Sequence, residues 1–173
     1  MDLNEEIRQE VTSRLDQVWV SDITYLHTKE GWAYLCIILD LHSRKIISWA
    51  IDKHMEASLV VSALNSAIKT RNGVVDTIFH SDCGGQYKSN VVRNVLARSG
   101  MKQSMTYAGN CYDNATAESF FGTLKSELDQ CQFSSFQEAE CVIFEYIEVF
   151  YNRKRLHSAL GYKSPDEFER EAA

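Results

Sequence analysis

The sequence has little proline and no long apolar run, and each shortage excludes a class of protein. Its 173 residues include one proline, Pro165, and no Pro/Gly/Ser-rich linker divides them, so we expect one domain. The longest apolar run, 33–39, is far too short to span a bilayer. The acidic N-terminus lacks the basic-then-apolar pattern of a secretion signal. We therefore expect a cytoplasmic protein with no membrane partner.

The thiols and imidazoles lack the spacing of a metal or redox site. The number of cysteines, 5, is odd, and no two of them have C-x-x-C spacing. None of the 5 histidines pairs with a cysteine at zinc-finger spacing. We expect free thiols in a reducing compartment. The cysteines are Cys36, Cys83, Cys111, Cys131 and Cys141.

Positive charge is also scarce. The chain has 18 lysines and arginines against 24 carboxylates, which gives a net charge of −6 and a pI of about 5.4. A DNA-binding protein usually has an excess of basic residues, because they neutralise phosphates. If this chain binds nucleic acid, its positive charge must be concentrated locally, borrowed from metal ions or supplied by a separate basic domain.

Hydrophobic periodicity predicts a sheet flanked by helices. Three segments rich in β-branched and aromatic residues follow one another with short connections, as in an antiparallel meander. The period then becomes helical, and short strands alternate with helices. The expected strands are 18–26, 32–40, 44–51, 74–79 and 102–106, and the expected helices are 57–68, 89–98, about 113–128 and one that begins near 135. This order predicts an α/β fold with a mixed five-stranded sheet and helices on both faces.

The last helix is predicted from a capping box and an apolar stripe. Ser135 and Glu138 have the S-x-x-E spacing in which each side chain binds the backbone N–H of the other residue. The expected core face is Phe136, Ala139, Ile143, Tyr146, Ile147 and Phe150.

Three carboxylates stand where strands and helices could present them together. Asp22 lies within a strand and shares a face with Val18 and Val20, where a charge is costly unless it is paired or binds a cation. Asp82 follows the expected strand 74–79, and strand ends commonly carry ligand-binding residues. Glu118 falls in the first turns of a helix. Carboxylates alone can hold Mg²⁺ or Mn²⁺.

Each carboxylate also has a purely structural explanation. Asp82 precedes two glycines and could be a turn former. Glu118 could favour the helix dipole, and Asp22 could be an edge-strand charge. Taken singly, each of these explanations is the better one, so the three residues need a shared reason.

Four blocks of sequence around these carboxylates supply a shared reason for them. They are W-V-S-D-I-T-Y at 19–25, H-S-D-C-G-G-Q-Y at 80–87, a block at 109–121 that ends in A-E-S-F-F, and Y-N-x-x-R-x-H-S-A-L-G-Y at 151–162. With residues 34–50, they resemble the retrovirus-type integrase core of bacterial insertion sequences, in particular the DDE transposases of the IS-three family. The likeness covers about residues 17–168. The 35 residues between Asp82 and Glu118 match that family's D-D-35-E spacing.

The resemblance implies a ribonuclease H-like fold and an enzyme that cuts and rejoins DNA with two Mg²⁺ or Mn²⁺ ions. It makes Asp22, Asp82 and Glu118 the catalytic metal ligands, and our hypothesis is that Asp22 bridges both ions. Water would release a 3′-hydroxyl at the element end, and this hydroxyl would attack a second phosphodiester. The implied partners are DNA, as element ends and target, and further copies of the chain in a homodimer or higher oligomer. The implied location is the bacterial cytoplasm, at the nucleoid.

Six residues are candidate DNA contacts. Lys125 stands seven residues beyond Glu118, where the family carries a basic residue, and two helical turns place both on one face. The full set is Lys125, Asn114, Gln86, Tyr87, Arg155 and His157. Several have alternatives, because Asn114 could cap its helix, Tyr87 could belong to the core, and the last pair could fix the last helix.

Two departures from the family pattern keep other functions open. Cys83 replaces the usual arginine after Asp82, and no helix-turn-helix region precedes Trp19. We therefore expect an N-terminal tail or short helix at 1–16, an isolated core at 17–168 and a C-terminal tail at 169–173. The alternatives are a ribonuclease H-type nuclease that only hydrolyses, and an inactive domesticated core that serves as a dimerisation or DNA-scaffold module. The intact triad, its spacing and Lys125 favour the transposase.

Overall fold

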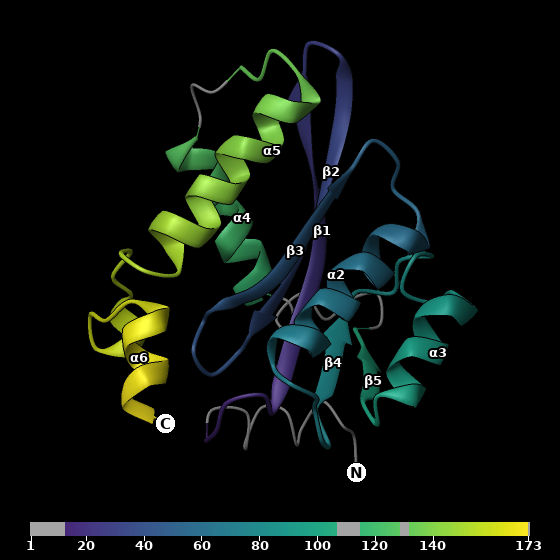
Figure 1. Cartoon of the computed structure of the whole chain (residues 1–173), viewed down its shortest axis with the longest axis vertical. Coiled ribbons are helices and arrows are strands. Elements are labelled where there is room, and N and C mark those ends of the chain that lie inside the picture. Colours follow the sequence, from purple (N-terminus) through teal and green to yellow (C-terminus); the bar gives the residue numbers. More distant parts are fainter. Residues whose placement is uncertain (1–12, 107–114, 129–131, 173) are drawn as a thin grey trace.

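Five strands form one mixed sheet (Figure 1). The computed structural model describes residues 13–106, 115–128 and 132–172. The strands are β1 (Val18–Thr28), β2 (Gly31–Asp40), β3 (Ile46–Asp52), β4 (Ile78–Ser81) and β5 (Lys102–Met105). Their order is β3-β2-β1-β4-β5, in which the pairings among β1, β2 and β3 are antiparallel and those of β4 are parallel. The predicted sheet is confirmed.

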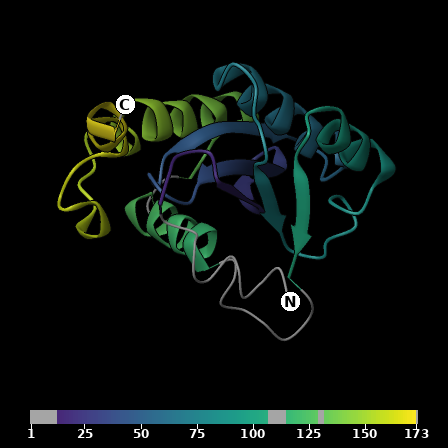
Figure 2. The same cartoon turned by 90° about the horizontal axis from the view of Figure 1, so that it is seen from below.

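Helices cover both faces of the sheet, as predicted. They are α2 (Ala57–Thr70), α3 (Asn90–Arg98), α4 (Ala115–Glu127), α5 (Phe136–Phe144) and α6 (Pro165–Ala172), with a π-helical segment (Glu145–Tyr151) that continues α5 and a 3₁₀ turn (Ser158–Leu160). Figure 2 shows α2 and α4 on opposite sides of the strands. No helix within the described ranges is long and apolar enough to cross a membrane.

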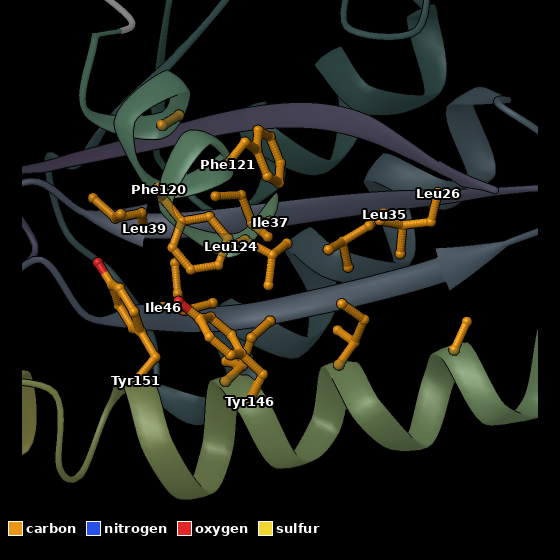
Figure 3. Packing of buried hydrophobic residues seen from close by; sticks show 14 of the residues in the cluster. Leu26, Leu35, Ile37, Leu39, Ile46, Phe120, Phe121, Leu124, Tyr146 and Tyr151 are labelled. Carbon is orange, nitrogen blue, oxygen red and sulfur yellow. The ribbon is translucent and has the colours of Figure 1, made fainter. Parts of the chain in front are cut away.

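Two apolar clusters hold the helices to the sheet. Strand alternation sends Val18 and Val20 into the cluster beneath α4 and α5, and Trp19 into the cluster beneath α2 and α3. Figure 3 shows Phe120 and Leu124 of α4 close to the β2 side chains in the first cluster. Each such aromatic or aliphatic side chain stabilises the fold by about 1.5–3 kcal/mol through burial. This packing fixes α4 against the sheet.

Strand β4 begins later than the sequence predicts. The expected strand 74–79 and the observed strand Ile78–Ser81 share only residues 78 and 79. Val75 is 79% exposed, and Asp76 has a positive φ of 56°, so this segment turns before the strand begins. The strand instead includes His80, whose ring nitrogens both lie 2.9 Å from hydroxyls, those of Ser104 and Thr106. These partners make a buried histidine acceptable in a central strand.

A π-helical turn changes the core face of the last helix. Phe150, expected in the core, is 40% exposed, whereas Tyr151 is 4% exposed. Residues 145–151 have the wider π turn, which rotates later residues relative to a regular α-helix. The capping box is also shifted. Ser135 Oγ accepts from Glu138 N, but the Glu138 carboxylate accepts from Ser134 N.

An ion-pair network ties α6 to the rest of the molecule. Residues 169–172, expected as part of a tail, continue α6. Arg71, just beyond α2, donates both terminal nitrogens to the Glu169 carboxylate at 3.0 and 2.5 Å. Its Nε lies 3.0 Å from Asp16 Oδ1, and Ser43 Oγ donates to Glu169 at 2.7 Å. One arginine therefore joins the start of the described chain to its end.

Candidate active site

The sheet register places two of the three carboxylates side by side. Ser21 of β1 pairs with Ser81 of β4, and Asp22 and Asp82 are the next residues on these parallel neighbours. Adjacent strands lie about 4.8 Å apart, so both aspartates emerge at one point of the sheet. There β4 ends while β1 continues, and Asp22 is partly buried whereas Asp82 is exposed.

Helix α4 supplies the third carboxylate. It packs on β1 through its buried face, which includes Ala117 and Phe121. Asp22 shares the strand face of Val18 and Val20, which belong to the cluster that α4 covers, so its side chain lies on the α4 side of the sheet. Glu118 lies in the first turn of α4 and is exposed. The site is therefore formed by β1, the end of β4 and α4.

The charges of these side chains act on one another. Burial, together with the negative charges of Asp82 and Glu118, raises the pKa of Asp22 from 3.8 to about 6. The Ile23 N–H, which donates to Asp22 Oδ1 at 2.8 Å, and the Lys125 ammonium oppose this shift. The three carboxylates and Lys125 thus form one electrostatic cluster, in which negative charge exceeds positive charge.

The donor set fits a hard divalent cation. Carboxylate oxygens are the ligands that Mg²⁺ and Mn²⁺ prefer, and excess negative charge attracts a cation. Within the described ranges, no group of three or more His, Cys, Asp or Glu side chains is gathered closely enough to hold an ion as it stands. Carboxylates that repel one another separate, so ligation requires the side chains of this cluster to turn inward.

Lys125 lies over an exposed aromatic ring. Its Nζ is 4.9 Å from the centroid of Tyr25, a cation–π contact. Tyr25 is 58% exposed and meets Trp32 edge-to-face at 5.2 Å. Lys125 lies seven residues beyond Glu118 on α4, two turns along the same face. Tyr25 and Trp32 are not among the site residues predicted from the sequence, although large aromatic side chains at alternate strand positions could have indicated them.

The other candidates near Asp82 divide between surface and core. Gln86 is half-buried and donates to the carbonyl of Met55 at 3.2 Å. Tyr87 is 1% exposed, and its hydroxyl lies 2.9 Å from Ser21 Oγ. Of the two alternatives for Tyr87, the structure favours the core, so its ring offers no surface to DNA.

Arg155 and His157 do not join this cluster. Arg155 and His157 line a groove on another side of α4, together with Thr116 and Thr123. Thr116 lies two residues before Glu118, which is about 200° around the helix. Asn114 lies outside the described residues. Sequence proximity to a family motif therefore does not imply proximity to the carboxylates.

Comparisons with protein families identify the chain. A model described as Integrase core domain matches residues 12–111, and a second model with the same description matches residues 99–165. The chain therefore belongs to the integrase core domain family. A mixed five-stranded sheet that carries carboxylates on β1, after β4 and on α4 agrees with that membership.

Curated relatives come from insertion sequences. The chain is 47% identical over 154 residues to the Insertion element IS600 uncharacterized 31 kDa protein of Shigella sonnei, covering 88% of this chain and 57% of the relative. It is 44% identical over 155 residues to the Transposase InsF for insertion sequence IS3A of Escherichia coli (strain K12), covering 89% and 54%. The chain spans little more than half the length of these relatives, and the predicted link to insertion-sequence transposases is confirmed.

A solved structure supports the fold alone. The HTLV-2 integrase catalytic core domain, solved in complex with magnesium in a dimeric form, superimposes with a TM-score of 0.65. The match has 16% sequence identity and covers 91% of this chain and 97% of that chain. The expected ribonuclease H-like fold is confirmed.

Proposed function

We propose that this chain is the catalytic core, over residues 17–168, of an insertion-sequence transposase that cuts and joins DNA by phosphoryl transfer. One observation carries the proposal: Asp22 and Asp82 lie side by side where β4 ends, and their charges and those of Glu118 and Lys125 act on one another. The relationship to insertion-sequence transposases supports it. The alternatives, a purely hydrolytic nuclease and a non-catalytic module, have no comparable support.

Divalent ions are the proposed cofactor. Asp22, Asp82 and Glu118 would hold two Mg²⁺ or Mn²⁺ ions, which would activate the attacking oxygen and neutralise charge on the departing one. The magnesium in the HTLV-2 core domain supports this choice. Asp82 is already oriented, because its Oδ1 accepts a hydrogen bond from Gly84 N at 2.9 Å.

The proposed reaction consists of two displacements at phosphorus. Water attacks a phosphodiester at the element end, the bond from phosphorus to the 3′-oxygen breaks, and a 3′-hydroxyl is released. That hydroxyl then attacks a second phosphodiester, and another 3′-oxygen departs. Lys125 lies at the edge of the carboxylate cluster, where its ammonium would hold a phosphate beside the reacting bond.

The proposed partners are DNA and further copies of the chain. DNA ends must be brought together before they are joined, which favours a homodimer or higher oligomer. The dimeric form of the HTLV-2 core domain supports that arrangement. The proposed location is the bacterial cytoplasm.

Resolution of branched DNA tests the function. The substrate imitates a joined product, so the reaction needs phosphoryl transfer but no recognition of element ends. We expect the chain in Mn²⁺ to resolve the branch, and Asp82→Asn to lower the rate by at least about 10²-fold, since charge stabilisation by one group is of this order. A pre-nicked element end, assayed in parallel, reports cleavage and joining.

Asp76→Asn is the matched control. It makes the same chemical change at an exposed aspartate that precedes β4. The Asp76 carboxylate lies 3.6 Å from Lys102 Nζ, away from the candidate site, and we expect unchanged activity. Equal product from the chain and from Asp82→Asn would refute a catalytic role for Asp82. Metal-dependent cleavage without joining or branch resolution would identify a nuclease instead.

A further inference from the structure

A polar groove lies beside α4, away from the carboxylate cluster. Its volume is about 580 Å³. The residues that line it come from the β2–β3 turn, from one side of α4 and from the segment after the π-helical turn. Its polar members include Arg44, Thr116, Ser119, Thr123, Arg155 and His157. Neither Glu118 nor Lys125 lines it, so we treat it as a site separate from the carboxylate cluster. We call it the arginine groove after Arg44 and Arg155.

Arg44 contributes a positive charge that no described carboxylate neutralises. Its side chain is partly buried, and its Nη1 donates to Thr116 Oγ1 at 2.5 Å. No ion pair joins it to a carboxylate in the described part of the chain. A guanidinium withdrawn from water is costly unless an anion meets it. This cost would be recovered if an anion occupied the groove.

Arg155 adds a second guanidinium. Its Nε donates to Glu127 Oε1 at 3.2 Å, and the same carboxylate accepts from Tyr146 Oη at 2.6 Å through its other oxygen. Glu127 is thus shared between two donors, and the remaining nitrogens of Arg155 stay available. The groove therefore has two arginines and one neighbouring carboxylate among the described residues.

His157 also lines the groove. Its Nε2 is buried and has no hydrogen-bond partner in the ranges that the structure describes. The ring is held edge-on to Tyr151 at 4.9 Å, and its backbone N–H donates to the Lys163 carbonyl at 3.0 Å. Burial and the charges of Arg155 and Arg44 lower the pKa of His157 to about 4. The imidazole is thus neutral at pH 7, and the tautomer with Nε2–H could donate to an anion once the side chain turns this buried nitrogen toward the groove.

We propose that the arginine groove binds a phosphodiester of the DNA backbone, separately from the carboxylate site. Two guanidiniums, an imidazole and the hydroxyls of Ser119 and Thr123 form a set of donors that suits phosphate oxygens. Local concentration of positive charge is one way for a chain of net charge −6 to bind DNA, and the two arginines of this groove provide it. This inference rests on the proposed action on DNA. It implies that α4 contacts the duplex at two points around its axis.

Salt-dependent binding tests the groove without catalysis. We would titrate a labelled 30-base-pair duplex in EDTA between 50 and 200 mM salt, following fluorescence anisotropy. Arg44→Gln should weaken binding about 5- to 20-fold and lower the slope of log K against log salt by about 0.9, the value for one phosphate contact. Thr123→Glu, which places a negative charge in the groove, should weaken binding by a similar factor.

Matched controls make the same changes outside the groove. Arg98→Gln removes an exposed arginine of α3, and Ser62→Glu adds a carboxylate to the exposed side of α2, which does not line the groove. Each should change the affinity less than about 2-fold. Thermal unfolding of all four variants separates lost contacts from lost structure.

Two outcomes would refute the binding of a phosphodiester in the arginine groove. In one, Arg44→Gln and Thr123→Glu bind the duplex as well as their controls. In the other, 10 mM inorganic phosphate stabilises the chain but not Arg44→Gln, while duplex binding is unchanged, which would identify a site for small anions instead. Because the titration contains no divalent metal, it does not depend on the carboxylates, and the branch-resolution assay judges the proposed function separately.

Discussion

At the scale of single residues, the carboxylate cluster lowers the stability of the metal-free fold at neutral pH. Asp22 is partly buried beside two other carboxylates, so its charged form is disfavoured. Its folded-state pKa of about 6 exceeds the ordinary 3.8. The penalty is therefore absent below pH 3.8, grows as pH rises between these values, and is complete above pH 6. This is the expected signature of a site arranged for a cation and not for stability.

Asp22→Asn should therefore stabilise the metal-free chain at neutral pH. The amide keeps an oxygen that can accept the Ile23 N–H but carries no charge. We expect the free energy of unfolding to rise by about 1–3 kcal/mol at pH 7.5 and to change little at pH 3.5. Urea unfolding in EDTA at both values measures this, and an equal effect at both would refute the electrostatic explanation.

Gly84 controls the position of Asp82. A Cβ added at this position would lie 2.9 Å from Asp82 Oδ1, so the carboxylate would have to move. Gly84→Ala should lower branch resolution by about 10- to 100-fold, because displacements near 1 Å at a reacting centre cost about 10²-fold. Gly85→Ala, whose Cβ would meet nothing within 4 Å, is the control and should remain active. Thermal stability of both variants should stay close to that of the parent chain.

At the scale of elements, the long periodic segments follow the sequence, whereas the short strand β4 does not. The meander β1–β3 and helix α2 lie close to their predicted ranges, since each carries many apolar residues at one period. Strand β4 has four residues, two of them His80 and Ser81. The ring of His80 is acceptable there because the hydroxyls of Ser104 and Thr106 bind it, and those partners lie in another segment of the chain.

The π-helical turn makes a testable difference between two adjacent aromatic residues. Tyr151→Ala should lower the free energy of unfolding by about 3–5 kcal/mol, because the ring is buried against Phe120 at 4.9 Å. Phe150→Ala should cost less than about 1 kcal/mol, since that ring is partly exposed. Urea unfolding of both variants decides. Equal costs, or the reverse order, would mean that the helix continues with a regular α turn.

At the scale of the whole molecule, ion pairs between residues far apart in sequence hold α6 against the rest of the protein. Burial raises the pKa of Glu169, but the hydrogen bonds from Arg71 and Ser43 outweigh it, and the net pKa lies below 4.5. A lowered folded-state pKa means that the stabilisation is present above pH 4.5 and is lost as the pH falls through the folded value. Acid should therefore weaken the attachment of α6 only once the pH falls below the ordinary 4.5.

Glu169→Gln measures that attachment. At pH 7 we expect a loss of about 2–4 kcal/mol, because it leaves the partly buried Arg71 without a full partner. The loss should shrink as the pH falls below 4.5, because the parent carboxylate then becomes protonated as well. Glu171→Gln, which removes only an exposed pair with Lys163, should cost less than about 1 kcal/mol. A pH-independent loss for Glu169→Gln would exclude the ionic explanation.

Sequence by itself determined the mixed sheet and the order of strands and helices as far as α5, but not α6, and it singled out the three carboxylates as a candidate site. Those features depend on local periodicity and on long motifs with fixed spacing, which one chain displays in full. Only the tertiary structure decided the rest. It placed Tyr87 in the core, turned Phe150 outward and separated Arg155 and His157 from the carboxylates. It also left Arg44 without a described carboxylate. Burial and pairing depend on segments far apart in sequence, and no local pattern encodes them.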